Sequence, residues 1–286
     1  MSSILDTYVD GSSFSRLKYF ALFLLCGLLI FVIPRFLFGV FEPVFQLCLT
    51  VIFYSLTRFT RKNNGYDKYN QIYSAFLIAS IITFLDNLVY FFEINKDTTI
   101  PGMFFTQIIT STLIIAPILM FTRTSGTNYS SIYLQRGNLR KNLAIGLGSF
   151  LFFLVLTIVN PRGASMFFPI NPDVSNAKLV SLLMWIVPFV LLNGVKEELW
   201  FRGLFLKQYE LFLGPYLANI LQPLIFSVAH MSVEYTSVLL GFLVVTFVLV
   251  LVWGYIIQRT DSIIGASLFH SATDIAIILG IFSYLV

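Results

Sequence analysis

Three short groups of polar residues in the last third of the chain hold the side chains that could do chemistry. The first group sets two neighbouring carboxylates before an arginine. The other two contain the only histidines of the chain, and the second histidine is followed by an aspartate. The six residues are Glu197, Glu198, Arg202, His230, His270 and Asp274. Carboxylates and imidazoles gathered around one point can activate a water molecule, so these groups indicate a hydrolytic site.

Helical spacing gives the two neighbouring glutamates different roles. Residues four apart share one face of a helix. Glu198 and Arg202 have this spacing, which predicts an ion pair between them. Glu197 lies about 100° further round the helix and is free to face other groups. His270 and Asp274 are also four apart, so both are expected to face the same site.

A turn at Gly214-Pro215 is predicted to bring the first two groups together. Glycine is common just past one helix end and proline at the start of the next. Glu197 lies 17 residues before Gly214, and His230 lies 16 residues after it. Two antiparallel helices joined there would place Glu197 and His230 level with each other. Phe226 shares the face of His230.

Two versions of the chemistry remain open from the residues alone. In one, His230, His270 and Asp274 hold Zn²⁺ while Glu197 acts as the general base, in the manner of catalytic zinc sites with two histidines and an acid. In the other, no metal is needed. Glu197 takes the proton of water, and the imidazoles with Asp274 stabilise the oxyanion. The zinc motif with two histidines at i and i+4 is absent.

The helices that must position these residues belong to a membrane protein. Hydrophobic residues make up 57% of the chain and charged residues 11%, whereas soluble domains carry roughly 25% charged residues. The net charge of +4 is spread over loops, which fits membrane topology better than nucleic-acid binding, so no nucleic-acid partner is expected. Cys26 and Cys48 match no metal or redox spacing and are expected in the core. No small-residue cleavage site follows the first apolar run, which predicts a retained anchor.

Apolar runs predict an all-α polytopic fold of about eight or nine transmembrane helices. The nine candidate spans are 19–40, 43–58, 69–93, 101–121, 142–160, 179–195, 215–232, 236–257 and 263–285. Lys and Arg near span ends stay cytoplasmic. They gather in alternate loops, as at 58–68, 123–141 and 196–207, which predicts a cytoplasmic N-terminus and an outside C-terminus.

Depth along the helices predicts where the site lies in the bilayer. His270 is about eight residues, or roughly 12 Å of helix, from the charged turn at 259–261. His230 would lie roughly 24 Å from Gly214. The two depths agree if the hairpin 203–215 projects into the cytoplasm. The site is then expected in the cytoplasmic half of the membrane, open to water from inside.

The polar stretch 122–141 is the best internal boundary. It is expected to be a cytoplasmic loop between a four-span N-terminal unit, residues 1–121, and a C-terminal unit, residues 142–286, which carries nearly all the unusual polar residues. Asp86 lies inside the third span. With Asn87 it is expected to bond neighbouring helices, and the alternative is a functional or partner contact.

The three groups together resemble the signature of the CPBP intramembrane protease family, which includes the type II CAAX prenyl endopeptidases and bacteriocin-processing or self-immunity proteins. The resemblance rests on Glu197-Glu198-x-x-x-Arg202, Phe226-x-x-x-His230 and His270-x-x-x-Asp274, and covers about residues 179–285. It implies an intramembrane endopeptidase in which Glu197 activates water, Glu198 and Arg202 orient it, and the histidines bind metal or the oxyanion. Many relatives have asparagine at the position of Asp274, so this chain adds a possible negative charge there.

The expected partners are the lipid bilayer and a peptide or membrane-protein substrate. The unit 1–121 lies outside the resemblance and could select substrates, bind a membrane partner or only pack. Two other interpretations stay open. One is a non-catalytic membrane scaffold or bacteriocin self-immunity protein with the same fold, and the other is a secondary transporter that uses the acids and histidines as a proton relay. The lack of internal repeats counts against the transporter.

Overall fold

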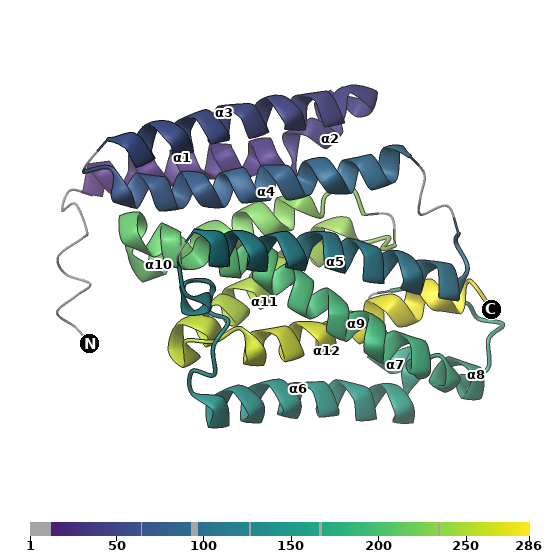
Figure 1. Ribbon diagram of the computed structural model, residues 1–286. Helices are drawn as coiled ribbons and strands as arrows, with labels where there is room; N and C mark the ends of the chain where they lie inside the picture. Colours follow the sequence, from purple (N-terminus) through teal and green to yellow (C-terminus); the bar gives the residue numbers. More distant parts are fainter. Residues whose placement is uncertain (1–12, 64, 93–96, 126, 166–167, 234) are drawn as a thin grey trace.

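The computed structural model describes residues 13–63, 65–92, 97–125, 127–165, 168–233 and 235–286, and within these residues every regular element is helical (Figure 1). The all-α polytopic fold is therefore confirmed. The α-helices are α1 (Ser13–Phe31), α2 (Ile33–Leu37), α3 (Glu42–Lys62), α4 (Asp67–Phe91), α5 (Ile100–Thr124), α6 (Leu139–Val159), α7 (Pro161–Ala164), α8 (Asn176–Ser181), α9 (Leu183–Glu197), α10 (Leu204–Ala229), α11 (Leu239–Thr260) and α12 (Ile264–Ser283). Short 3₁₀ turns span Gly39–Phe41 and Tyr129–Ile132, and a π-helical turn, η3, spans Glu198–Gly203.

Eight helical stretches in the described residues are long and apolar enough to cross a membrane. The predicted sixth and seventh spans belong to one of them, which runs over 47 residues from Leu183 to Ala229. Gly214 interrupts it with φ 75° and ψ 168°, a conformation suited to glycine. The chain reverses direction at this residue. The evidence is that Phe201, before the turn, and Phe226, after it, have their ring centres 4.8 Å apart. The predicted turn at Gly214-Pro215 is thus present.

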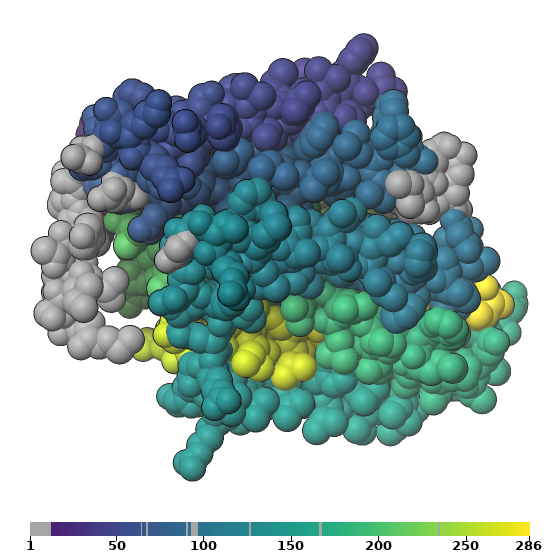
Figure 2. Space-filling model, viewed as in Figure 1, coloured from purple at the N-terminus to yellow at the C-terminus, as the bar shows by residue number. Residues whose placement is uncertain are grey.

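The helices form layers around the C-terminal part of the chain (Figure 1). α1, α3 and α4 make one outer layer and α6 the opposite edge, while α9, α10, α11 and α12 lie between them. α12 packs against α6, α9 and α11, and its buried fraction is the highest among the spans at 67%. Figure 2 shows its yellow residues only in patches between neighbouring helices. Because neighbouring helices surround α12, its residues His270 and Asp274 lie in the interior.

The segments predicted to be cytoplasmic meet at one end of the bundle. The backbone N–H of Asn138 donates to the Thr260 carbonyl oxygen over 2.8 Å. The Lys207 ammonium donates to the Ser130 carbonyl oxygen over 3.1 Å. The side-chain amide of Gln258 donates to the Pro215 carbonyl oxygen over 3.0 Å. The loop 127–138, the Gly214 turn and the turn after α11 therefore share one end of the bundle, as an alternating topology requires.

The hairpin at Gly214 is packed inside the helix bundle, and its projection beyond the bilayer stays a prediction. Leu206, Tyr209 and Phe212 are 0%, 1% and 3% exposed. The Tyr209 ring stacks on Phe23 of α1 at 5.3 Å, and Tyr19, also on α1, contacts Phe212 at 5.0 Å. Lys207 and the neighbouring polar residues suggested a projecting hairpin, but the apolar residues between them are buried against α1 and α4.

Candidate active site

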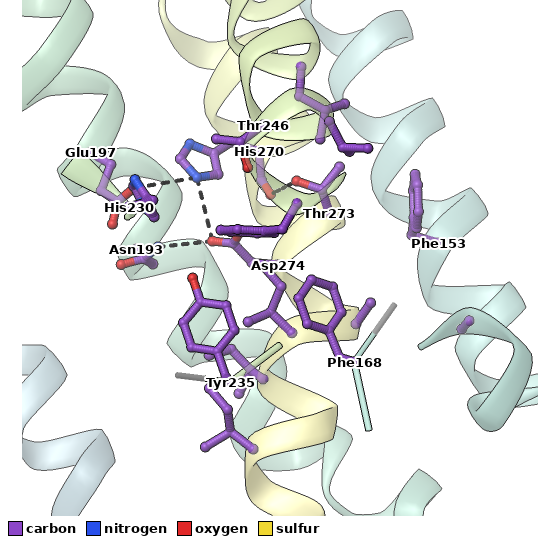
Figure 3. A pocket seen from close by; sticks show the side chains of 18 of the residues that line it. Phe153, Phe168, Asn193, Glu197, His230, Tyr235, Thr246, His270, Thr273 and Asp274 are labelled. Carbon is purple, nitrogen blue, oxygen red and sulfur yellow. Dashed lines mark hydrogen bonds and ion pairs between the residues drawn. The ribbon is translucent and has the colours of Figure 1, made fainter. Parts of the chain in front are cut away.

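All six predicted site residues lie close together where η3 meets α9, α10, α11 and α12. Figure 3 shows Glu197, His230, His270 and Asp274 among them. Glu197 is the last residue of α9, and Glu198 and Arg202 lie on the π-helical turn that follows. His230 caps the end of α10, and His270 and Asp274 lie on α12. Four of them, Glu197, His230, His270 and Asp274, line a cavity, while Glu198 and Arg202 lie outside its lining.

Glu198 makes the predicted ion pair and a second contact that the sequence did not suggest. Its Oε1 lies 2.9 Å from the Arg202 guanidinium, and both side chains are 0% exposed. The same Oε1 accepts a hydrogen bond from His270 Nδ1 over 2.8 Å. Arg202 also lies over the rings of Phe226 and Trp253, at 4.6 and 5.4 Å. Glu198 therefore fixes both the arginine and the imidazole, which leaves His270 Nε2 facing the other acids.

His270 Nε2 lies between two carboxylates. Its distances to Glu197 Oε2 and to Asp274 Oδ2 are both 3.6 Å, and the Glu197 side chain is 18% exposed to the cavity. The imidazole stacks on the Trp253 indole, with ring centres 4.0 Å apart and planes 14° apart. Three carboxyl groups, those of Glu197, Glu198 and Asp274, thus surround one imidazole. Trp253 on α11 was not among the predicted residues, because nothing in its local sequence distinguishes it from a core tryptophan.

His230 is oriented by its own helix end. Its Nδ1 lies 2.8 Å from the Phe226 carbonyl oxygen. A carbonyl oxygen only accepts, so Nδ1 carries the hydrogen and a neutral His230 keeps its lone pair on Nε2. The Phe226 ring contacts His230 at 4.4 Å and His270 at 6.1 Å. Phe226 thus packs against both histidines, on the same face as His230.

The site opens into a cavity of about 480 Å³. Its polar wall includes Glu197, His230, His270 and Asp274, and most of the remaining lining is apolar. The apolar residues include Phe153, Leu156, Phe168, Phe189, Phe242, Val245, Leu249 and Ile278. A narrow polar wall in an apolar chamber suits a substrate segment with apolar side chains and one reacting polar bond.

The cavity extends away from the end of the bundle that holds the positively charged loops. α6 and α11 meet at that end through the Asn138–Thr260 hydrogen bond. The cavity lies toward the other ends of these helices, where Gly163 and Gly241 line it. The sequence predicted an opening to the positively charged side, and the lining does not support that opening.

Two residues outside the predicted set also face the cavity. Figure 3 shows the hydroxyl group of Tyr235 pointing toward Asn193 and Asp274. Burial raises the pKa of Tyr235, so its hydroxyl stays protonated and can donate a hydrogen bond. The Asn193 amide donates to Asp274 Oδ2 over 2.9 Å. Sequence reasoning missed both, because their roles depend on contacts between distant segments.

Zn²⁺ binding by His230, His270 and Asp274 stays a prediction. No group of three or more His, Cys, Asp and Glu side chains in the described part of the chain is grouped to hold a metal ion. His270 binds Glu198 through Nδ1, which leaves Nε2 toward Glu197 and Asp274, and Asp274 accepts from Asn193. These contacts fit acid–base chemistry by Glu197 and His270.

One protein-family model matches the part of the chain that holds the site. Residues 179–276 match the family model described as type II CAAX prenyl endopeptidase Rce1-like. The match contains all six predicted site residues and confirms the resemblance drawn from the three groups. Searches among curated proteins and solved structures found no match. The first five long helices lie outside the matched residues.

Proposed function

From the match of residues 179–276 to a CAAX prenyl endopeptidase family, we propose that this multi-pass membrane protein is an intramembrane endopeptidase in which Glu197 activates water. The observation that carries the proposal is the position of His270 Nε2 between Glu197 and Asp274, 3.6 Å from each, on the wall of the cavity. The paired acids and imidazole give one place where water, a base and an oxyanion donor meet.

In the proposed mechanism, Glu197 takes a proton from a water molecule as its oxygen attacks the carbonyl carbon of the scissile peptide bond. The His270 imidazolium, held through Nδ1 by Glu198, donates Nε2–H to the oxyanion that forms. His230 Nε2 accepts the other hydrogen of the water and orients it. The protonated Glu197 then gives its proton to the leaving amine as the carbon–nitrogen bond breaks.

The remaining parts of the chain receive roles consistent with this site. We propose that residues 142–286 form the protease domain, that 122–141 is a cytoplasmic loop, and that the unit 1–121 supports the domain. With the N-terminus cytoplasmic, the cavity lining favours access from the outer half of the membrane. A peptide or membrane-protein segment is the proposed substrate, and prenylated CAAX peptides are a candidate from the family description.

A direct assay tests the activity and its metal requirement. Purified protein in phospholipid vesicles is incubated with a quenched fluorescent CAAX peptide, farnesylated or unmodified. We expect product fragments by mass spectrometry with at least one of the two. Since the site is proposed to work without metal, prior treatment with 1,10-phenanthroline should leave the rate within about twofold. Loss of activity that Zn²⁺ restores would contradict the metal-free mechanism.

Thiol labelling tests the side of access. In a variant with Cys26 and Cys48 replaced by alanine, Ser237→Cys introduces a thiol at an exposed position near the mouth of the cavity, where Ser237 lines an adjoining hollow of about 340 Å³. We expect a membrane-impermeant maleimide to label this thiol in intact cells. Arg136→Cys, at the other end of the bundle, serves as the matched control and should react only after permeabilisation. The reverse pattern would show that the cavity faces the cytoplasm.

A further inference from the structure

A side chain from outside the matched residues reaches the candidate active site. Gln107 lies on α5, is 6% exposed and lines the cavity. Its Nε2 donates to Asn193 Oδ1 over 3.2 Å. The Asn193 Nδ2 in turn donates to Asp274 Oδ2 over 2.9 Å. Two amides therefore connect a helix of the N-terminal unit to the carboxylate beside His270.

This series of hydrogen bonds ends at the ammonium group of Lys196. Lys196 Nζ donates to Gln107 Oε1 over 3.4 Å. An ammonium group has three donors and no acceptor, so the atom of Gln107 that faces it must be the oxygen. The nitrogen of Gln107 then faces Asn193, which must present its own oxygen. The Asn193 nitrogen is left facing Asp274, and every contact pairs a donor with an acceptor.

Reversing either amide would break this order. A reversed Gln107 would set its NH₂ group against the Lys196 ammonium. A reversed Asn193 would set its carbonyl oxygen against the Asp274 carboxylate and leave a buried acceptor facing an anion, which is costly. The orientation of Asn193 is therefore set by Gln107 on α5 together with Lys196.

We propose that Gln107 is a positioning residue that, with Lys196, holds the Asn193 amide so that its N–H faces Asp274. The N-terminal unit thereby completes the active site and does more than pack against it. Asp274 in turn lies 3.6 Å from His270 Nε2, so its placement affects the group that meets the oxyanion. This inference rests on the proposed function and assigns a role to a part of the chain that the matched residues leave out.

The isosteric change Gln107→Glu tests the direction of the hydrogen bonds. Glutamate at this position still accepts from Lys196 but can only accept from Asn193, so Asn193 must turn its nitrogen to residue 107 and its oxygen to Asp274. We expect kcat on the hydrolysed CAAX peptide to fall about tenfold, with KM within about twofold. In an Asp274→Asn background, the asparagine can donate to the reversed Asn193, and Gln107→Glu should then cost less than about threefold.

The matched control is Gln46→Glu. Gln46 is also a fully buried amide of the N-terminal unit, but it donates to the Ile30 carbonyl oxygen and not toward the site. Folded Gln46→Glu protein should keep the wild-type kcat. Equal losses from Gln107→Glu with aspartate and with asparagine at position 274 would overturn the inference, because a purely structural defect would not depend on residue 274.

A second measurement needs no substrate. Dicyclohexylcarbodiimide reacts with protonated carboxyl groups in apolar surroundings, and mass spectrometry locates the adduct. Gln107→Leu leaves Asn193 free to turn away, so the protonated fraction of Asp274 and its labelling rate should rise at least about threefold. Gln46→Leu should leave the rate unchanged, and an unchanged rate in Gln107→Leu would overturn the inference.

The outcomes also separate this inference from the proposed function. If Glu197→Gln leaves hydrolysis intact, the proposed function fails whatever happens at residue 107. If Glu197→Gln abolishes hydrolysis while Gln107→Glu behaves like the wild type in both backgrounds, only the positioning role fails.

Discussion

Glu197→Gln is expected to abolish peptide hydrolysis while the protein stays folded. The amide keeps the size of the carboxylate but cannot take a proton from water, and a general base contributes roughly 10²–10⁴-fold to a rate. The Glu197 side chain is 18% exposed to the cavity, and its distance to His270 Nε2 is 3.6 Å. We expect kcat to fall about 10³-fold or more, measured on the CAAX peptide in vesicles, with the thermal unfolding midpoint unchanged.

Glu210→Gln is the matched control, because Glu210 is also a carboxylate on the same helical stretch but lies near the Gly214 turn. It accepts from Gln258 over 2.7 Å and from Tyr133 over 3.2 Å, and it does not line the cavity. Its variant should hydrolyse the peptide at the wild-type rate. If Glu197→Gln and His230→Ala both keep full biological activity at normal protein levels, the protease interpretation is wrong. A non-catalytic membrane scaffold would then explain the observed geometry of the site better.

Local spacing predicted the parts of the site that depend on one helix or one turn. The four-residue interval between Glu198 and Arg202 gave their ion pair, which the structure confirms at 2.9 Å. The glycine and proline at 214 and 215 gave the reversal, because glycine accepts the positive φ that the turn needs. Equal distances from that turn then placed Glu197 and His230 at one level. Such inferences need only the geometry of regular helices.

Contacts between distant segments could not be predicted in this way. The hydrogen bond from His270 to Glu198 joins two helices whose relative rotation is decided by packing, not by spacing. The π-helical turn at Glu198–Gly203 also changes the rotation that an α-helix would give after Glu197. Burial of the hairpin at Gly214 also depends on contacts between distant segments. Lys207 and its polar neighbours indicated a projection into the cytoplasm, whereas Tyr209 is buried by its contacts with α1 and α4. The role proposed for Gln107 on α5 depends on contacts with α9 in the same way.

Arg202→Met is expected to cause the largest loss of stability. Arg202 and Glu198 are both fully buried, and their functional groups lie 2.9 Å apart. Removing the guanidinium leaves the Glu198 carboxylate with His270 as its remaining charged neighbour and removes the cation that lies over Phe226 and Trp253. Breaking a buried ion pair by removing one partner costs about 3–5 kcal/mol. The variant should therefore accumulate poorly and unfold at a lower temperature in detergent, as static light scattering during heating would show.

The double variant Glu198→Gln/Arg202→Met separates the loss of charge balance from the loss of packing. With both charges gone, methionine fills much of the arginine volume, and glutamine keeps an oxygen that can accept from His270 Nδ1. Replacing both partners of a buried pair is often close to neutral, so we expect the double variant to recover most of the lost stability. Its hydrolysis should stay well below that of the wild type, because a neutral glutamine at position 198 no longer stabilises the His270 imidazolium. Equal stability of Arg202→Met and the wild type would show that Glu198 is neutral in the fold, and the anionic anchor assigned to His270 would have to be abandoned.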